Sequence, residues 1–188
     1  MSVSEQWAQY AIAGPKSRDL LRLLVDRQHD ISDATFPYLS AREITIAGGI
    51  LARLFRISFS GELAYELAVP ARYGDSTIRA IMAAGQAFGV TPYGVETLNT
   101  MRIEKGHVGG AELNGTTTAR DLGLGRMMAT KKDYIGRVMS QRPGLVEPTR
   151  WDLIGLKPVD ASARLRAGSH LIGVGKPAVA AHDEGYVT

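Results

Sequence analysis

A carboxylate between two small side chains is the arrangement in this sequence best suited to bind a ligand. Residues 58–70 read Ser-Phe-Ser-Gly-Glu-Leu-Ala-Tyr-Glu-Leu-Ala-Val-Pro. In an extended strand, successive side chains point to opposite faces. The large apolar residues of the run then share one face: Tyr65, Leu67 and Val69. Glu66 lies on the other face between Ala64 and Ala68, where a flat ring has room to approach.

A carboxylate in such a place can accept two parallel N–H bonds, as it does from a guanidinium. A pterin ring offers a comparable donor pair, N3–H and its exocyclic amine. The same pattern also fits a strand with one solvated face, on which Glu66 simply points to water. The residues by themselves leave both interpretations open.

Hydrophobic periodicity predicts the elements that must position this strand. Alternation of apolar residues predicts four strands: residues 7–13, 42–47, 50–59 and 64–69. Gly48-Gly49 is a hairpin turn signal between the second and third strands. The third strand is expected to place four apolar residues on one face: Leu51, Phe55, Ile57 and Phe59. Spacings of three and four predict helices at residues 16–27, 75–88 and 95–104, the last with Val95, Leu98 and Met101 inward.

The pattern changes beyond Gly106, where glycine pairs mark turns. Residues 134–139 are compatible with a short helix, and residues 142–148 read as a linker. Further strands are expected at residues 152–156, 169–174 and 178–181. Helices set among runs of hairpin strands are typical of an α+β fold.

Composition excludes several classes of site. The chain has 188 residues, 45% of them apolar and 22% charged, as is ordinary for a globular protein. It contains no cysteine, which rules out disulfides, thiolate metal sites and a cysteine nucleophile, and suits a reducing compartment. Its four histidines have no metal-ligand spacing, so no metal site is expected.

Charge and hydropathy limit the classes of partner that the sequence predicts. The 22 basic residues nearly balance the 19 acidic ones, so the net charge of +3 makes a nucleic-acid partner unlikely. A basic group at residues 126–142 could bind an anionic chain or a partner, but a solvated surface is the default for such a run. No stretch approaches the ~20 apolar residues of a membrane span, and no secretion signal is recognised. A cytoplasmic protein without membrane contact is therefore expected.

Residues 58–70 resemble a motif of the aminomethyltransferase (T-protein) family of the glycine cleavage system. That motif is an aromatic-Ser/Thr-Gly-Glu run followed by an aromatic-Glu-hydrophobic strand and Val-Pro. In the family, the strand glutamate binds the pterin of tetrahydrofolate, and the aromatic before the turn lines the pocket. The resemblance implies that Glu66 and Phe59 bind the cofactor.

Two further segments are similar to the C-terminal region of heterotetrameric sarcosine oxidase α subunits. The first is residues 92–106, which end in Arg102-Ile103-Glu104-Lys105-Gly106, and the second is Asp121-Leu-Gly-Leu-Gly125. This resemblance implies that Arg102 contacts a folate carboxylate, although an ion pair with Glu104 or a neighbouring loop is the plainer interpretation. The family has a folate-holding arginine where this chain has Leu98, so the folate tail must be held differently. The family's catalytic aspartate lies upstream of this chain, so the catalytic residue is unknown.

The resemblance implies an aminomethyltransferase-like α+β region over residues 1–145, lacking its N-terminal part. Residues 146–188 would begin a C-terminal β-barrel, so the chain is expected to be a fragment that catalyses no complete reaction alone. Its implied function is the tetrahydrofolate-binding portion of a sarcosine oxidase α subunit, forming methylenetetrahydrofolate from the one-carbon unit of oxidised sarcosine. Flavin and NAD belong to other parts of that enzyme, and the expected partners are folate and the other subunits of a hetero-oligomeric oxidase.

Three alternatives remain. One is a glycine cleavage aminomethyltransferase, against which Leu98 and the Glu-Lys-Gly sequence argue. A second is a folate-dependent iron–sulfur or tRNA-maintenance relative, whose signature needs a cysteine where His107 stands. The third is a structural module that keeps the fold without activity.

Overall fold

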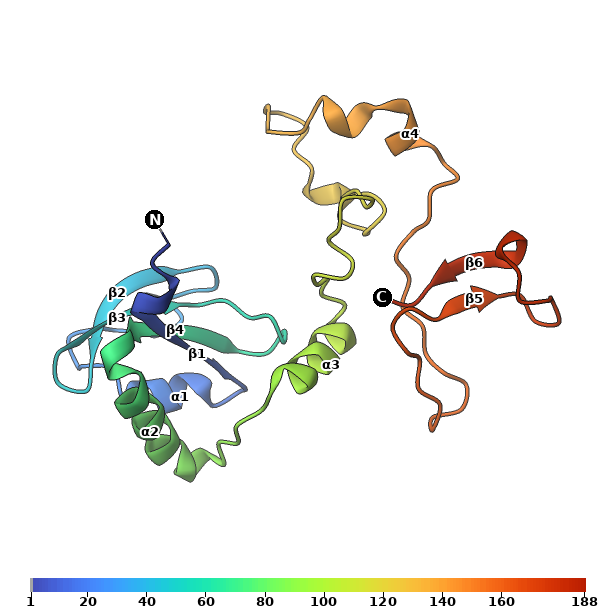
Figure 1. Ribbon diagram of the computed structural model, residues 1–188. Helices are drawn as coiled ribbons and strands as arrows, with labels where there is room; N and C mark the ends of the chain where they lie inside the picture. The colour runs from blue at the N-terminus through green and yellow to red at the C-terminus, as the bar shows by residue number, and fades with distance from the viewer. Residues whose placement is uncertain (1) are drawn as a thin grey trace. The chain divides into compact units, whose positions relative to one another are not determined.

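The chain divides into two compact units in the computed structural model, which describes residues 2–188 (Figure 1). The first unit is Met1–His107 and the second is Val108–Thr188. These units are compact bodies defined by their internal packing. They are not the family's domains, so the domain boundary expected near residue 145 stays a prediction.

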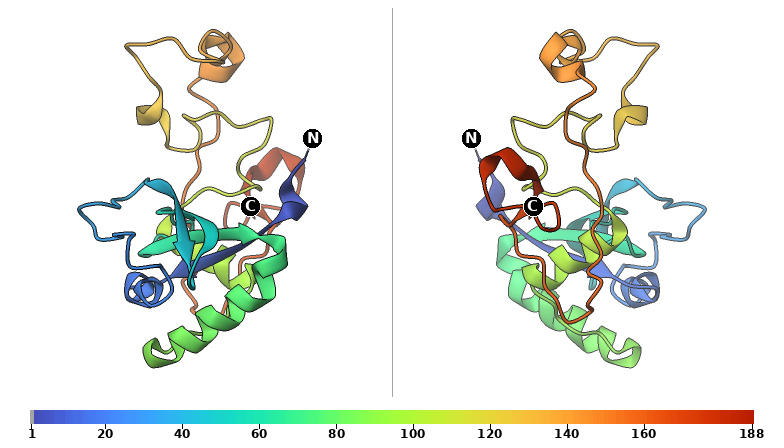
Figure 2. Two further views of the ribbon diagram at one scale, coloured as in Figure 1. Left: turned by 90° about the vertical axis from the view of Figure 1, so that its left-hand side faces the viewer. Right: turned by 90° about the vertical axis from the view of Figure 1, so that its right-hand side faces the viewer.

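A four-stranded antiparallel sheet forms the centre of the first unit. Its strands lie in the order β1 (Trp7–Ala13), β4 (Ala64–Pro70), β3 (Ile50–Phe55) and β2 (Ala41–Ile46). Helices α1 (Ser17–Arg22) and α2 (Gly74–Gly85) pack on one face of the sheet (Figures 1 and 2). Helix α3 (Val95–Lys105) ends this unit. The arrangement is the α+β fold that the sequence predicts, with the Gly48-Gly49 hairpin between β2 and β3.

The hydrophobic core lies between the helices and one face of the sheet. Tyr65, Leu67 and Val69 of β4 are fully buried, as the alternation predicts. Helices α1 and α2 add buried apolar side chains to this core: Leu20, Leu21 and Ile81. Each such side chain contributes roughly 1.5–3 kcal/mol when it leaves water, so this layer holds the sheet in place.

The core side of β3 is not the face on which the alternation gathers Leu51 and Phe55. Ala52 and Leu54 are fully buried, whereas Leu51 is 50% exposed. The strand also ends at Phe55 rather than continuing to residue 59. The reason is its register, because Leu54 lies opposite Leu67, on the core side of β4, which puts Phe55 opposite Glu66 on the other side.

The helix predicted at residues 16–27 ends at Arg22, because the following residues pair with β2 instead. Val25 forms a β-bridge with Ile46, and the amide of Asp26 donates to the carbonyl of Thr45 at 3.0 Å. In α3, Val95 is 73% exposed, so its predicted inward position is wrong. The buried residue of that helix is Arg102.

The second unit has little regular structure. Strands β5 (His170–Ile172) and β6 (Asp183–Tyr186) pair antiparallel, and the first falls inside a predicted strand. The strands expected at residues 152–156 and 178–181 are absent from the described structure, as is the helix at 134–139. One helical turn, α4 (Pro143–Val146), lies within the predicted linker. The buried apolar core residues of the described chain all lie between Ile12 and Ile81, so this unit depends on polar contacts.

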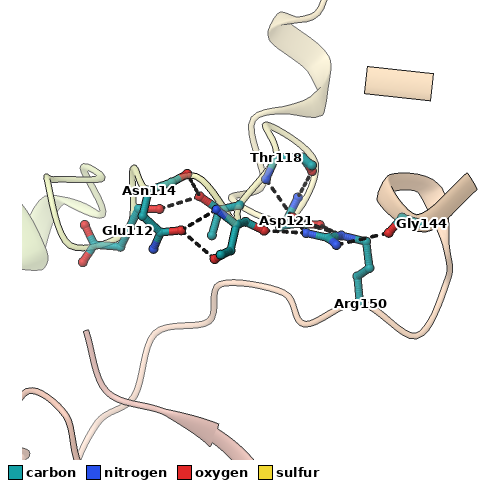
Figure 3. A network of polar contacts seen from close by, with 8 residues as sticks. Glu112, Asn114, Thr118, Asp121, Gly144 and Arg150 are labelled. Atoms are coloured by element: carbon teal, nitrogen blue, oxygen red, sulfur yellow. Dashed lines mark hydrogen bonds and ion pairs between the residues drawn. The ribbon is translucent and has the colours of Figure 1, made fainter. Parts of the chain in front are cut away.

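In the second unit, Asp121 and Arg150 form a partly buried ion pair (Figure 3). The Arg150 Nε atom donates to Asp121 Oδ1 at 3.0 Å, and the Thr118 amide donates to Asp121 Oδ2 at 2.7 Å. The guanidinium of Arg150 also donates to the carbonyl oxygens of Thr116 and Gly144, at 2.8 and 3.2 Å. The Arg150 guanidinium lowers the pKa of Asp121 to about 2. This network ties residues 116–121 to residues 144–150.

Candidate functional site

Glu66 lies on the face of the sheet opposite the two helices, as the alternation predicts. Its strand β4 is flanked by β1 and β3, so Glu66 has Ala11 opposite it on one side and Phe55 on the other. Along its own strand the neighbours on this face are Ala64 and Ala68, which are 4% and 5% exposed. Three alanines therefore form a low surface around the carboxylate, and the Phe55 ring bounds one side of it. We call this surface, made of Ala11, Ala64, Ala68 and Phe55, the alanine platform.

Glu66 itself is half-buried and has a neutral partner. The side-chain amide of Gln9 on β1 donates a hydrogen bond from Nε2 to Glu66 Oε2. Gln9 lies opposite Ala68, one diagonal step from Glu66, within reach of a long side chain. Within residues 2–188 no other donor reaches this carboxylate, so Oε1 is available to a ligand.

The nearest cation on this face is engaged elsewhere. Arg53 of β3 lies opposite Ala68. Its guanidinium stacks over the Trp7 ring, 4.4 Å from the ring centroid, and its Nε lies 3.4 Å from Glu43 Oε1. Glu66 thus has no cationic partner among the described residues, which suits its carboxylate to accept N–H bonds from a ligand.

Phe59 lies on the loop of residues 56–63, which leads into β4. Its ring is 42% exposed, so it is accessible to a ligand. The same loop holds two buried hydroxyls, those of Ser58 and Ser60, which find no hydrogen-bond partner in the described chain. Burying a hydroxyl without a partner costs roughly 1–3 kcal/mol, which native proteins usually avoid. The loop therefore has unused hydrogen-bonding capacity beside an exposed aromatic ring.

Arg102 lies in the last turn of α3 and is only 8% exposed. Its Nη1 donates to the carbonyl oxygen of His107 at 3.2 Å, so the guanidinium holds the segment that follows the helix. This contact is to a backbone carbonyl, so it is not the ion pair that the sequence suggests as the plainer role of Arg102. Leu98 stands one turn earlier on the helix and is half-buried.

Sequence reasoning missed Gln9 and Ala11, and it placed Phe55 only on the apolar face of its strand. All three become neighbours of Glu66 only through the pairing of β4 with β1 and β3. The one local signal is that Gln9 and Ala11 share a face of the first predicted strand, because they are two residues apart.

Two cavities of the described chain lie elsewhere. One, of about 280 Å³, lies in the first unit beside Arg27 and His29. The other, of about 310 Å³, lies in the second unit beside Tyr134 and Met139. Glu66 lines neither of them. No group of three or more histidine, aspartate or glutamate side chains suited to a metal ion occurs among residues 2–188.

Comparison with known proteins decides the family. The profile of the GCVT N-terminal domain matches residues 1–132, more than two thirds of the chain. The chain belongs to the GCVT N-terminal domain family. This membership confirms the resemblance of residues 58–70 to the aminomethyltransferase family.

Relatives of this GCVT-family chain include much longer proteins. The sarcosine oxidase subunit alpha of Rhizobium meliloti is 54% identical over the whole chain, which covers 19% of that protein. The protein of the same name from a Corynebacterium species (strain U-96) is 40% identical, again over the whole chain and 20% of the relative. An aminomethyltransferase of Koribacter versatilis is 30% identical over 84% of the chain and 41% of its own length. The chain thus spans about a fifth of the sarcosine oxidase subunits that it matches.

No helix in the described part of the chain has the length and apolar character needed to cross a bilayer.

Proposed function

We propose that this GCVT-family chain is the tetrahydrofolate-binding portion of a sarcosine oxidase α subunit. In this role it accepts the one-carbon unit of oxidised sarcosine. The observation that carries the proposal is Glu66 on the alanine platform, with a negative charge that no cation neutralises. The 54% identity to a sarcosine oxidase subunit alpha supports this parent over an aminomethyltransferase, for which the identity is 30% over less of the chain.

The side chains around Glu66 fit a pterin. In this proposal a flat ring lies over the short side chains of Ala11, Ala64 and Ala68. The carboxylate then meets the ring at its edge and accepts two N–H bonds, a geometry that charge-assisted pairs favour. The exposed ring of Phe59 adds an aromatic surface for the bound cofactor.

Arg102 is proposed to act at the folate tail, where a carboxylate needs a cation. Its guanidinium already donates to the His107 carbonyl, so it is held in place before a ligand binds. Leu98, at the position of the family's second arginine, contributes no charge. Tail binding should therefore be weaker than pterin binding, and Glu66 should dominate the affinity.

Tetrahydrofolate, when bound, supplies the amine that accepts the one-carbon unit. The residues of this chain bind and orient that cofactor, and burying its ring excludes water that would hydrolyse the reactive one-carbon unit. Flavin and NAD are proposed for other parts of the parent enzyme, whose other subunits would be partners of this chain. The absence of cysteine agrees with a cytoplasmic location.

Calorimetric titration with a reduced folate tests the proposal. Glu66→Ala should weaken binding on the order of 100-fold or more, because two charge-assisted hydrogen bonds of roughly 1.5–3 kcal/mol each are lost. Glu66→Gln keeps the volume but removes the charge and one acceptor, so it should weaken binding to an intermediate degree.

Asp75→Ala is the matched control, since Asp75 is an exposed carboxylate on α2, which packs on the other face of the sheet. It should bind folate as the wild type does. Equal affinity of the wild type and Glu66→Ala would show that the pterin assignment is wrong.

A further inference from the structure

Among the described residues, Gln9 is the side chain that donates to the Glu66 carboxylate, and it does so from a strand far away in sequence. The two residues are 57 positions apart, yet the register of β1 against β4 makes them diagonal neighbours. The amide of Gln9 donates to Oε2, which fixes one oxygen of the carboxylate toward β1. The second oxygen, Oε1, is left for an incoming donor.

The chemical character of Gln9 matters as much as its position. An amide restrains the carboxylate through a hydrogen bond but brings no net charge. A lysine or arginine in the same place would form an ion pair and compete with the N–H donors of a ligand. The cation that this face does carry, Arg53, is drawn toward Trp7 and Glu43 instead. Glu66 is thereby oriented without being neutralised.

From this geometry we propose that Gln9 is a positioning residue for ligand recognition by Glu66. The inference rests on the proposed function and adds the residue that prepares the carboxylate for the paired N–H donors of the pterin. Because the carboxylate is already oriented in the free chain, less side-chain freedom is lost when the ligand binds.

A double-mutant cycle in the full chain separates positioning from mere folding. Gln9→Met keeps the length of the side chain but removes the hydrogen bond. It should weaken binding of folinic acid by about tenfold, the effect of losing one hydrogen bond to a charged group. In a Glu66→Ala background the same Gln9→Met change should have no effect, because the group that it positions is gone.

Gln9→Lys should weaken binding more than Gln9→Met, because its ammonium group competes for the carboxylate. All the single variants should keep the wild-type melting temperature, since Gln9 is exposed. If Gln9→Met weakens binding equally in both backgrounds, or not at all, the inference is overturned while the proposed function stands. A wild type that binds no folinic acid overturns both.

A second measurement needs no ligand. The side-chain amide signals of Gln9 in the ¹H–¹⁵N spectrum of the free chain should shift in Glu66→Ala and stay unchanged in Asp75→Ala, because Asp75 lies on α2 on the other face of the sheet. Gln9 signals that are unaffected by Glu66→Ala would show that the hydrogen bond is not formed in solution, which also overturns the inference. This measurement still tests the positioning role of Gln9 if Glu66→Ala binds folinic acid too weakly for the double-mutant cycle.

Discussion

Glu66 is set apart from the other carboxylates of the sheet by what surrounds it. Glu43, on the same face, has Arg53 as its partner, whereas Glu66 has an amide and three methyl groups. A carboxylate on a solvated strand would normally be surrounded by long polar side chains that interact with water. Here three alanines flank the carboxylate along its strand and across to β1, and their short side chains are the basis on which a flat ligand is proposed.

Ala11 gives the most direct test of the alanine platform. It is exposed on β1, opposite Glu66, so a larger side chain there should stand in the space proposed for the ring. Ala11→Ile should weaken binding of a reduced folate about tenfold or more through steric exclusion. The fold should be retained, because isoleucine is favoured in strands.

Ala41→Ile is the corresponding control on β2, on the same face but two strands away from β4. Titration of both variants gives the comparison. If Ala11→Ile binds as tightly as Ala41→Ile, the ligand does not lie over this part of the sheet.

The loop of residues 56–63 joins β3 to β4 and contacts the end of helix α3. Arg56 donates from Nη1 to the carbonyl of Ala64 at 3.0 Å and stacks on the Tyr65 ring, which anchors the start of the loop to β4. At its turn, Gly61 has a φ of +82°, and its α-carbon lies against the Lys105 side chain at the end of α3. The turn therefore sets both the position of Phe59 and the contact with α3.

Gly61→Ser should destabilise the first unit by about 1–2 kcal/mol, because a residue with a β-carbon is strained at positive φ. The new β-carbon would also come 2.3 Å from Lys105 Cγ, so the lysine would have to move. Urea unfolding followed by the fluorescence of Trp7 measures the change. Gly94→Ser is the matched control, since Gly94 has a φ of −97° at the start of α3, where serine is favoured. Similar losses in the two variants would contradict the role given to φ at Gly61.

The molecule as a whole has its apolar core in the first unit alone. Buried apolar residues run from Ile12 to Ile81, and the second unit is held by the Asp121–Arg150 network instead. A unit without a buried apolar layer lacks the main stabilising term of folding. Its stability should therefore depend strongly on this ion pair and on pH.

The pH dependence has a definite sign. The pKa of Asp121 is lowered to about 2 from an ordinary value of 3.8, chiefly by hydrogen bonds from Arg150, so its ionised form is favoured in the folded state. Its contribution is complete above about pH 4 and is lost as the pH falls through about 2. Asp121→Asn should lower the free energy of unfolding of this unit on the order of 2 kcal/mol at neutral pH.

Fluorescence of Trp151, which lies in the second unit, reports this transition in a Trp7→Phe background. The difference between wild type and Asp121→Asn should narrow as the pH is lowered from 4 to 2. A difference that stays constant over that range would show that Asp121 is not held ionised by Arg150.

The sequence by itself determined the strand of Glu66 and the face on which it lies. Alternation over residues 64–69 suffices because the two-residue period of a strand is a local property of the backbone. The positive-φ turns at Gly48 and Gly61 were likewise readable, since glycine favours such conformations locally. Family membership followed from motifs in the correct order, and the profile match confirmed it.

The tertiary structure alone decided what surrounds Glu66. Gln9 and Ala11 reach it through a pairing of strands more than fifty residues apart, and Phe55 reaches it through the register of β3 against β4. Arg102 lies buried beneath its own helix end for the same kind of reason, because its contact to His107 depends on how the chain turns after α3. Such neighbours are set by long-range hydrogen bonds and packing, and no period in the local sequence encodes which strands become adjacent.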